Sequence, residues 1–234
     1  MVKIDFIQNL IRERFNQEKN LPKHIVIGTY GAVLWSEKNN KPLAEAYRRK
    51  IENIKEIMKI QVEKEIPILT VNLLSKETKE DMSPIIAAFF EELISNELIA
   101  KNKIRITVIG KWYSLAKIVE PVKKIVEETK DYDSYFVNFC INYDGQEEIM
   151  DSLRVMAKKI ESGKLKSDEI TKEEIKDNLY SSYFIPVDLI IQNKRNLRGI
   201  LLWDSVNAKI VFSNKLFPDF TGKDFLRALE EYQE

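Results

Sequence analysis

The segment His24–Trp35, HIVIGTYGAVLW, constrains the fold more than any other stretch of the chain. It reads as a short apolar strand that runs into a glycine turn, and in open α/β sheets such a turn usually holds a phosphate or a catalytic group. Here the turn carries Tyr30, Ala32 and Leu34, and none of these is an acid or a cation. The sequence therefore predicts an α/β fold in which the architecture of a site is kept while its charged chemistry is lost.

Strand-like and helix-like segments alternate along the rest of the chain. The expected strands cover residues 25–29, 66–73, 104–109, 134–141, 189–191, 200–202 and 210–212. The expected helices cover residues 42–63, 84–98, 118–128, 147–161 and 222–234, with a polar loop at 36–41 and a further helix opened by Thr171, three residues before Glu174 as in a capping box. This alternation predicts a mostly parallel sheet flanked by helices.

The length and spacing of these segments bound the number of domains. A chain of 234 residues suits one α/β domain or at most two small ones. Apolar residues at helical spacing predict a helix over residues 2–19, and no repeat or proline-rich linker interrupts the remainder. We expect an N-terminal helix over residues 1–20 and a single domain over residues 21–234.

The charge balance and the rare residue types exclude several classes of function. The 37 acidic and 37 basic residues give no net charge, which argues against nucleic acid as a partner because phosphate binding needs a cationic excess. No apolar run approaches the ~20 residues of a membrane span, and the first residues lack a signal-peptide core, so we expect a cytoplasmic protein. The lone histidine, His24, is expected to be structural, and the lone cysteine, Cys140, to be a small buried hydrophobe.

Several segments together resemble the cis-prenyltransferase family, the undecaprenyl and dehydrodolichyl diphosphate synthases. HIVIGTYGAVLW is similar to the family's HxxxxxDGNGRW opening, ILTVNLLSKET to YLTLYAFSxEN, and LLWDSVNAKIVFSNKLFPDF to LLWQxAYAELYFTDxLWPDF. The likeness covers nearly the whole chain after His24. It implies a parallel six-stranded sheet surrounded by helices, an apolar tunnel for a growing prenyl chain, and usually a dimer. The implied reaction condenses isopentenyl diphosphate with an allylic diphosphate, and it requires Mg²⁺, carboxylates that hold it, and arginines that hold phosphate oxygens.

The residues that carry this chemistry in the family are replaced in this chain. The replaced positions are Tyr30, Ala32, Leu34, Leu43, Tyr47, Gln192, Asn196 and Lys209. Both expected magnesium carboxylates are among them, at Tyr30 and Lys209, so the resemblance implies no catalytic residue, no metal ligand and no cofactor here. Only Arg195 and Arg198 stand where residual phosphate contacts are possible. The isolated chain is therefore expected not to make polyprenyl diphosphate.

Three functions agree with this pattern of losses. The first is a non-catalytic accessory subunit, similar to those of the Nogo-B receptor type, that pairs with a catalytic paralogue making polyprenyl diphosphate (such as dolichol precursors) for lipid-linked glycan carriers. The pair would be a heterodimer or heterotetramer, its interface built by Trp203, Phe212, Leu216 and Phe217. The second is a prenyltransferase of changed chemistry, and the third an isoprenoid-binding protein. Self-association and peripheral contact with a membrane surface stay open.

Overall fold

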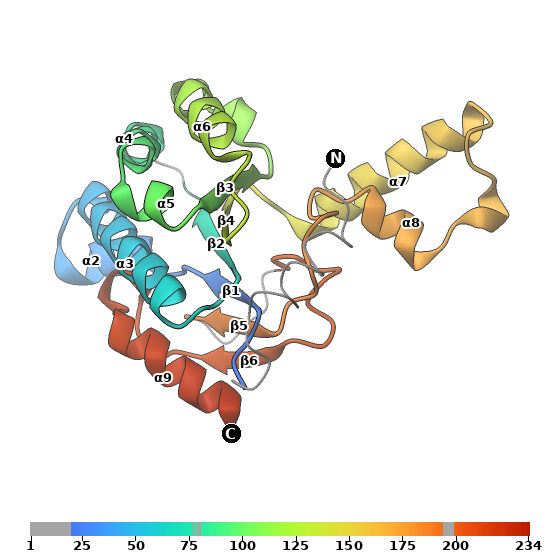
Figure 1. The fold of residues 1–234 in the computed structure, drawn as a ribbon. Coiled ribbons are helices and arrows are strands. Elements are labelled where there is room, and N and C mark those ends of the chain that lie inside the picture. Colours follow the sequence, from blue (N-terminus) through green and yellow to red (C-terminus); the bar gives the residue numbers. More distant parts are fainter. Residues whose placement is uncertain (1–19, 77, 79–80, 194–198) are drawn as a thin grey trace.

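A single sheet organises the computed structural model, which describes residues 20–76, 78, 81–193 and 199–234 (Figure 1). Its six strands lie in the order β3-β4-β2-β1-β5-β6, and every neighbouring pair is parallel. The strands are β1 (His24–Gly28), β2 (Ile68–Leu74), β3 (Ile104–Ile109), β4 (Tyr135–Ile141), β5 (Leu189–Gln192) and β6 (Lys209–Phe212). The predicted α/β fold with a six-stranded parallel sheet is confirmed. The helix predicted over residues 2–19 lies outside the described residues.

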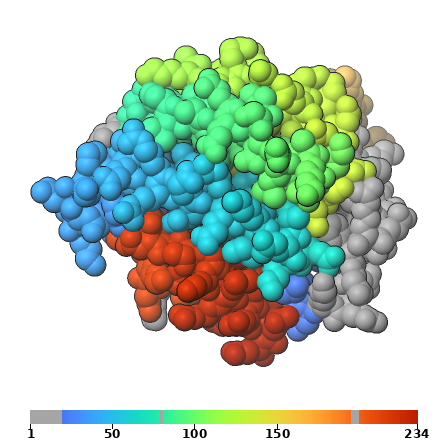
Figure 2. Space-filling model, turned by 60° about the vertical axis from the view of Figure 1, so that its left-hand side comes forward, coloured from blue at the N-terminus to red at the C-terminus, as the bar shows by residue number. Residues whose placement is uncertain are grey.

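Helices cover one face of this sheet. The helices are α2 (Ala32–Asn39), α3 (Leu43–Glu63), α4 (Ser83–Ile94), α5 (Glu97–Lys101), α6 (Ala116–Thr129), α7 (Gly145–Glu161), α8 (Lys172–Asp177) and α9 (Gly222–Gln233), with short 3-10 turns η1 (Trp112–Ser114), η2 (Ser167–Glu169) and η3 (Phe217–Asp219). The helices α3, α4, α6 and α9 pack with alternate strand residues into the larger apolar core. Figure 2 shows this helical side, where α9 (red) lies against α3 (light blue). None of the helices in the described part is long and apolar enough to span a bilayer.

The opposite face of the sheet is covered differently. Val26, Cys140 and Ile190 on that face pack against irregular segments around Phe184 and Leu201, and these residues form a second, smaller core. The helices α7 and α8 pack on each other and project away from the sheet (Figure 1). Cys140 is fully buried in this second core, as predicted.

Three local predictions were wrong, and each has a physical reason. The polar loop predicted at residues 36–41 is mostly helical, because α2 continues to Asn39 and ends at Asn40 in a left-handed turn with φ 51°. The helix predicted over 84–98 is two helices, because Asn96 caps α5 by accepting a hydrogen bond from the Leu98 amide at 2.9 Å. The strand predicted at 200–202 is a turn, and Leu201 is apolar because it is buried rather than paired in the sheet.

His24 is a buried neutral residue at the start of β1. Its Nδ1 donates to the Ile185 carbonyl at 2.8 Å, so its Nε2 accepts from the Thr70 hydroxyl at 2.9 Å. Burial lowers the pKa of His24 from 6.5 to about 4. The prediction that His24 is structural is supported by these contacts.

Acidification is expected to destabilise the fold through His24. Between the lowered folded pKa and the ordinary unfolded pKa, only the unfolded chain binds the proton, so stability falls as the pH falls from about 6.5 towards 4. We expect a loss of about 2 kcal/mol in the free energy of unfolding between pH 7 and pH 4.5, measured by urea denaturation. The variant His24→Gln should lose the part of this pH dependence that falls in that window. An unchanged slope in the variant would show that other groups carry it.

Candidate functional site

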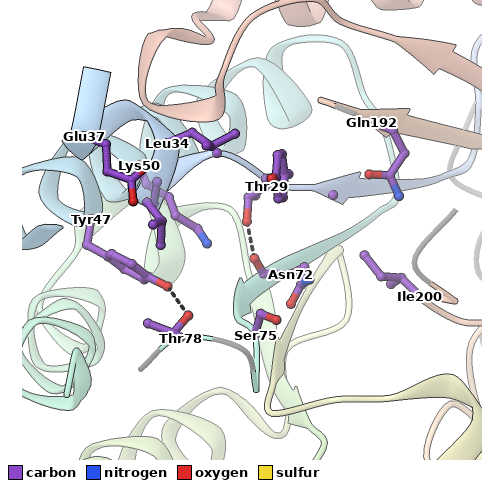
Figure 3. A pocket seen from close by; sticks show the side chains of 15 residues that line it. Thr29, Leu34, Glu37, Tyr47, Lys50, Asn72, Ser75, Thr78, Gln192 and Ile200 are labelled. Atoms are coloured by element: carbon purple, nitrogen blue, oxygen red, sulfur yellow. Dashed lines mark hydrogen bonds between the residues drawn. The ribbon is translucent and has the colours of Figure 1, made fainter. Parts of the chain in front are cut away.

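A pocket opens at the carboxyl ends of the three central strands (Figure 3). Gly28 and Thr29 at the end of β1, Asn72 of β2 and Gln192 of β5 contribute to its wall. The strand order changes direction between β1 and β5, because the chain continues from β1 to β2 on one side and from β5 to β6 on the other; ligands bind at such a point in open parallel sheets. The cavity measures about 290 Å³, in the range of small-molecule sites.

The glycine turn predicted from the sequence forms the rim of this pocket. Gly31 has φ +113°, and a side chain there would meet the Leu216 side chain at 2.8 Å, so the position requires glycine. Gly31 also precedes α2, whose first turn has no acidic side chain and contributes Ala32, Val33 and Leu34 to the lining. The site predicted at this turn thus exists as a cavity, and its rim is apolar.

The buried amine in this pocket belongs to Lys50 of α3, which the sequence analysis did not single out. Its side chain is only 3% exposed, and its Nζ donates to the Leu73 carbonyl at 2.7 Å. The same Nζ lies 5.0 Å from the centre of the Tyr47 ring. Burial lowers the pKa of Lys50 to about 7. A signal was present, because Lys50 falls at helical spacing on the buried stripe of Tyr47, Ile51 and Ile54.

Tyr47 closes the side of the pocket next to Lys50. Its hydroxyl is 3.0 Å from the Thr78 hydroxyl, and burial raises the pKa of Tyr47. On the other side of the pocket, Thr29 donates a hydrogen bond to the Asn72 carbonyl. The polar groups of the wall are therefore largely hydroxyls and amides that hold one another in place.

The structure brings together some of the replaced positions and separates others. Those that line the pocket are Tyr30, Ala32, Leu34, Tyr47 and Gln192. Leu43 is buried at the start of α3 and does not line it. Lys209 lies elsewhere, because its Nζ donates to the Glu231 carbonyl at 2.6 Å at the end of α9. The replaced Asn196 and the two candidate phosphate-contacting residues, Arg195 and Arg198, lie outside the described residues.

The pocket offers few ligands for a magnesium ion. Mg²⁺ is usually bound through one or two carboxylates together with substrate phosphates, and the described lining residues supply one carboxylate, that of the exposed Glu37 on α2. Within residues 20–76, 78, 81–193 and 199–234, no three His, Cys, Asp or Glu side chains gather where they could hold a metal. The arrangement can enclose an apolar ligand and offer it one buried amine.

The residues predicted to form a partner interface differ in exposure. Phe217 is fully buried in the larger core of the single chain. Leu216 is half-buried under the Gly31 turn, and Trp203 is also half-buried. Phe212, on the edge strand β6, is 40% exposed. Phe217 reads as an interface residue in the sequence because aromatic side chains serve cores and interfaces alike.

Comparison with known proteins gives one consistent family. Residues 30–234 match the family model described as "Putative undecaprenyl diphosphate synthase". The tritrans,polycis-undecaprenyl-diphosphate synthase (geranylgeranyl-diphosphate specific) of Methanocaldococcus jannaschii is 31% identical over 97% of this chain and 85% of its own. The isoprenyl transferase of Thermotoga maritima is 30% identical over 92% of this chain and 94% of its own.

Two solved structures share the fold. The lavandulyl diphosphate synthase of Lavandula x intermedia, in complex with dimethylallyl diphosphate, superposes with a TM-score of 0.84 at 23% identity, over 92% of this chain and 97% of that one. A probable undecaprenyl diphosphate synthase of Campylobacter jejuni superposes with a TM-score of 0.70 at 25% identity, over 91% and 95% of the two chains.

Proposed function

The chain belongs to the undecaprenyl diphosphate synthase family, the cis-prenyltransferases, and we propose that within this family it is a non-catalytic accessory subunit. It would pair with a catalytic paralogue and stabilise it. The observation that carries the proposal is the composition of the pocket, where Tyr30, Ala32 and Leu34 stand on the rim of an intact site.

The charge of the expected substrates makes this composition decisive. Two diphosphates bring several negative charges, which the reaction must neutralise while one diphosphate leaves. The described lining residues offer one basic group, the amine of Lys50, and it is held by a backbone carbonyl. A pocket of this composition supports the proposal that the chain keeps the fold of the family and does not catalyse its reaction.

An exposed apolar face on α7 supports the pairing. Met150, Leu153 and Ile160 are all exposed, and their spacing places them on one side of the helix. We call these three residues the α7 stripe. Because α7 projects from the sheet (Figure 1), a partner can reach this stripe without moving the core. Exposed apolar residues gathered on one side of a surface helix are one mark of an interaction surface.

Co-expression with a catalytic paralogue from the same genome tests the proposal. We expect the two chains to co-purify, and the polyprenyl diphosphate synthase activity of the pair to exceed that of the paralogue alone by about tenfold or more, since binding to the folded state stabilises it by mass action. Leu153→Lys in the α7 stripe should abolish co-purification, because a charge would be desolvated in the interface. Val155→Lys is the matched control, since Val155 is exposed on the opposite side of the same helix.

One outcome would contradict the accessory role, and another would contradict only its proposed surface. If the wild-type chain neither binds nor activates the paralogue, the role is wrong. If Val155→Lys disrupts pairing as strongly as Leu153→Lys, the α7 stripe is not the surface that pairs.

A second candidate is an isoprenoid-binding protein, which the apolar lining favours. Ala32, Val33, Leu34 and Ile200 give the pocket hydrocarbon walls that could hold a prenyl chain. Native mass spectrometry of the purified chain tests this candidate. A bound lipid of prenyl mass would support it, and protein of the bare mass would count against it.

A further inference from the structure

Lys50 places a primary amine in the wall of the pocket, whose rim is apolar. The residue is 3% exposed, and it lines a cavity of about 290 Å³. Figure 3 shows the amine pointing into the space between Thr29 and Tyr47. The helix α3 fixes this position, because Lys50 lies on the buried stripe of the helix between Tyr47 and Ile51. The amine is thus buried from bulk water and still faces the cavity.

The surroundings of this amine favour its neutral form. No carboxylate of a described residue lies within 4.0 Å of Lys50 Nζ, and its described contacts are the Leu73 carbonyl and the face of the Tyr47 ring. The titratable groups among the described lining residues are Tyr30, Glu37 and Tyr47, and Glu37 is exposed. An unpaired buried ammonium is costly, so the group loses its proton more readily, in agreement with a pKa lowered to about 7.

We propose that Lys50 is a covalent binding site for apolar aldehydes, which it holds as an imine. The amine nitrogen attacks the carbonyl carbon and the C=O π bond breaks, giving a carbinolamine. The hydroxyl group then leaves as water, the two amine protons are given up in the course of the reaction, and a C=N bond forms: R–CHO + H₂N–Lys50 gives R–CH=N–Lys50 + H₂O. No oxidant, reductant or metal takes part.

The geometry suits each part of this step. The hydrogen bond donated to Leu73 orients the amine and leaves its lone pair available to a carbonyl carbon. Desolvation in an apolar pocket is one of the established ways to make lysine nucleophilic near neutral pH. The apolar side chains of Ala32, Val33 and Ile200 would hold the hydrocarbon part of the ligand and keep water from the imine.

Reductive trapping of the full chain tests the proposal. The protein is incubated at pH 7 with citronellal, an apolar aldehyde, and with sodium cyanoborohydride, which reduces an imine to a stable secondary amine. Peptide mapping by mass spectrometry then compares Lys50 with Lys59, an exposed lysine on the same helix. About half of an amine with a pKa near 7 is neutral at this pH, against less than about 0.1% of an ordinary lysine. Allowing for the weaker nucleophilicity of the less basic amine, we expect at least about tenfold more label on Lys50.

Two further measurements separate pocket binding from general lysine reactivity. An excess of citronellol, which has the same carbon skeleton and no carbonyl group, should compete for the pocket and reduce the label on Lys50 but not on Lys59. In Lys50→Arg, which keeps a cation and removes the amine, label in the peptide that contains residue 50 should disappear, with circular dichroism reporting that the variant is folded.

Equal label on Lys50 and Lys59, or label on Lys50 that citronellol leaves unchanged, would overturn the proposal. The accessory role is tested by pairing, so the two proposals fail independently.

Discussion

The isolated chain, given farnesyl diphosphate, isopentenyl diphosphate and Mg²⁺, is expected to form polyprenyl diphosphate at less than about one thousandth of the rate of a catalytic relative. Removing a single pre-organised group that stabilises developing charge typically lowers the rate by ~10²–10³. The resemblance to the family's opening motif implies that several such groups are replaced together, at Tyr30, Ala32 and Leu34, which line the pocket, and no three described His, Cys, Asp or Glu side chains gather where they could hold a metal. The effects of such losses on the rate are not additive, but together they leave the pocket with little stabilisation of the transition state.

The assay needs a reference rate and a check that any product is formed in this pocket. The isoprenyl transferase of Thermotoga maritima, measured in parallel, provides the reference rate. Any product formed by the purified chain is checked with Gln192→Ala, because Gln192 lines the pocket at the end of β5 and a reaction there should change when it is truncated. Turnover within about tenfold of the reference that responds to Gln192→Ala would refute the loss of catalysis and favour a prenyltransferase of changed chemistry.

The central strands could be predicted from the sequence because β1, β2 and β4 are buried on both faces. Such strands read as continuous apolar runs, so the strand predicted over 66–73 has nearly the bounds of β2. The same signal misled at residues 200–202, where apolar side chains are buried in a turn. Periodicity alone does not tell these cases apart, because burial by tertiary contacts leaves the same pattern.

The second half of α2 was missed for a related reason. Residues 36–39 are polar and carry no apolar stripe, so the segment reads as a loop. The helix is held instead by Trp35, whose indole donates to the Asp219 carboxylate at 2.8 Å, far away in the sequence. A contact of that range leaves no local pattern to detect.

The sequence predicted the position of the candidate site better than it predicted the side chains that line it. The glycine turn after β1 placed Tyr30, Ala32 and Leu34 at the pocket, and the structure assembles them with Gln192. Lys50 was overlooked because a lysine on an amphipathic helix is usually solvated, and only its place on the buried stripe distinguishes it. Lys209 was expected near the site, but its side chain extends to the end of α9. The spacing of residues along one strand does not determine in which direction a long side chain extends.

Replacing Phe217 by alanine is expected to lower the free energy of unfolding by about 3–5 kcal/mol, because a fully buried aromatic side chain leaves a cavity when it is truncated. Phe217 stacks on Phe220, with ring centres 5.5 Å apart. Its backbone also connects two parts of the fold, since its amide donates to the Tyr30 carbonyl at 2.9 Å and its carbonyl accepts from Asn53 at 2.8 Å. The loss should therefore appear in urea denaturation of the isolated chain, without any partner present.

Phe212→Ala is the matched control, because Phe212 is the same residue type, close in sequence and 40% exposed. Its truncation should change the free energy of unfolding by less than about 1 kcal/mol. If Phe217→Ala proved as mild as Phe212→Ala and instead weakened pairing with a paralogue, the ring would serve an interface, as the sequence first suggested. A large loss of stability in the isolated chain would instead assign Phe217 to the core that supports the Gly31 turn, so that the same aromatic cluster holds the rim of the pocket in place.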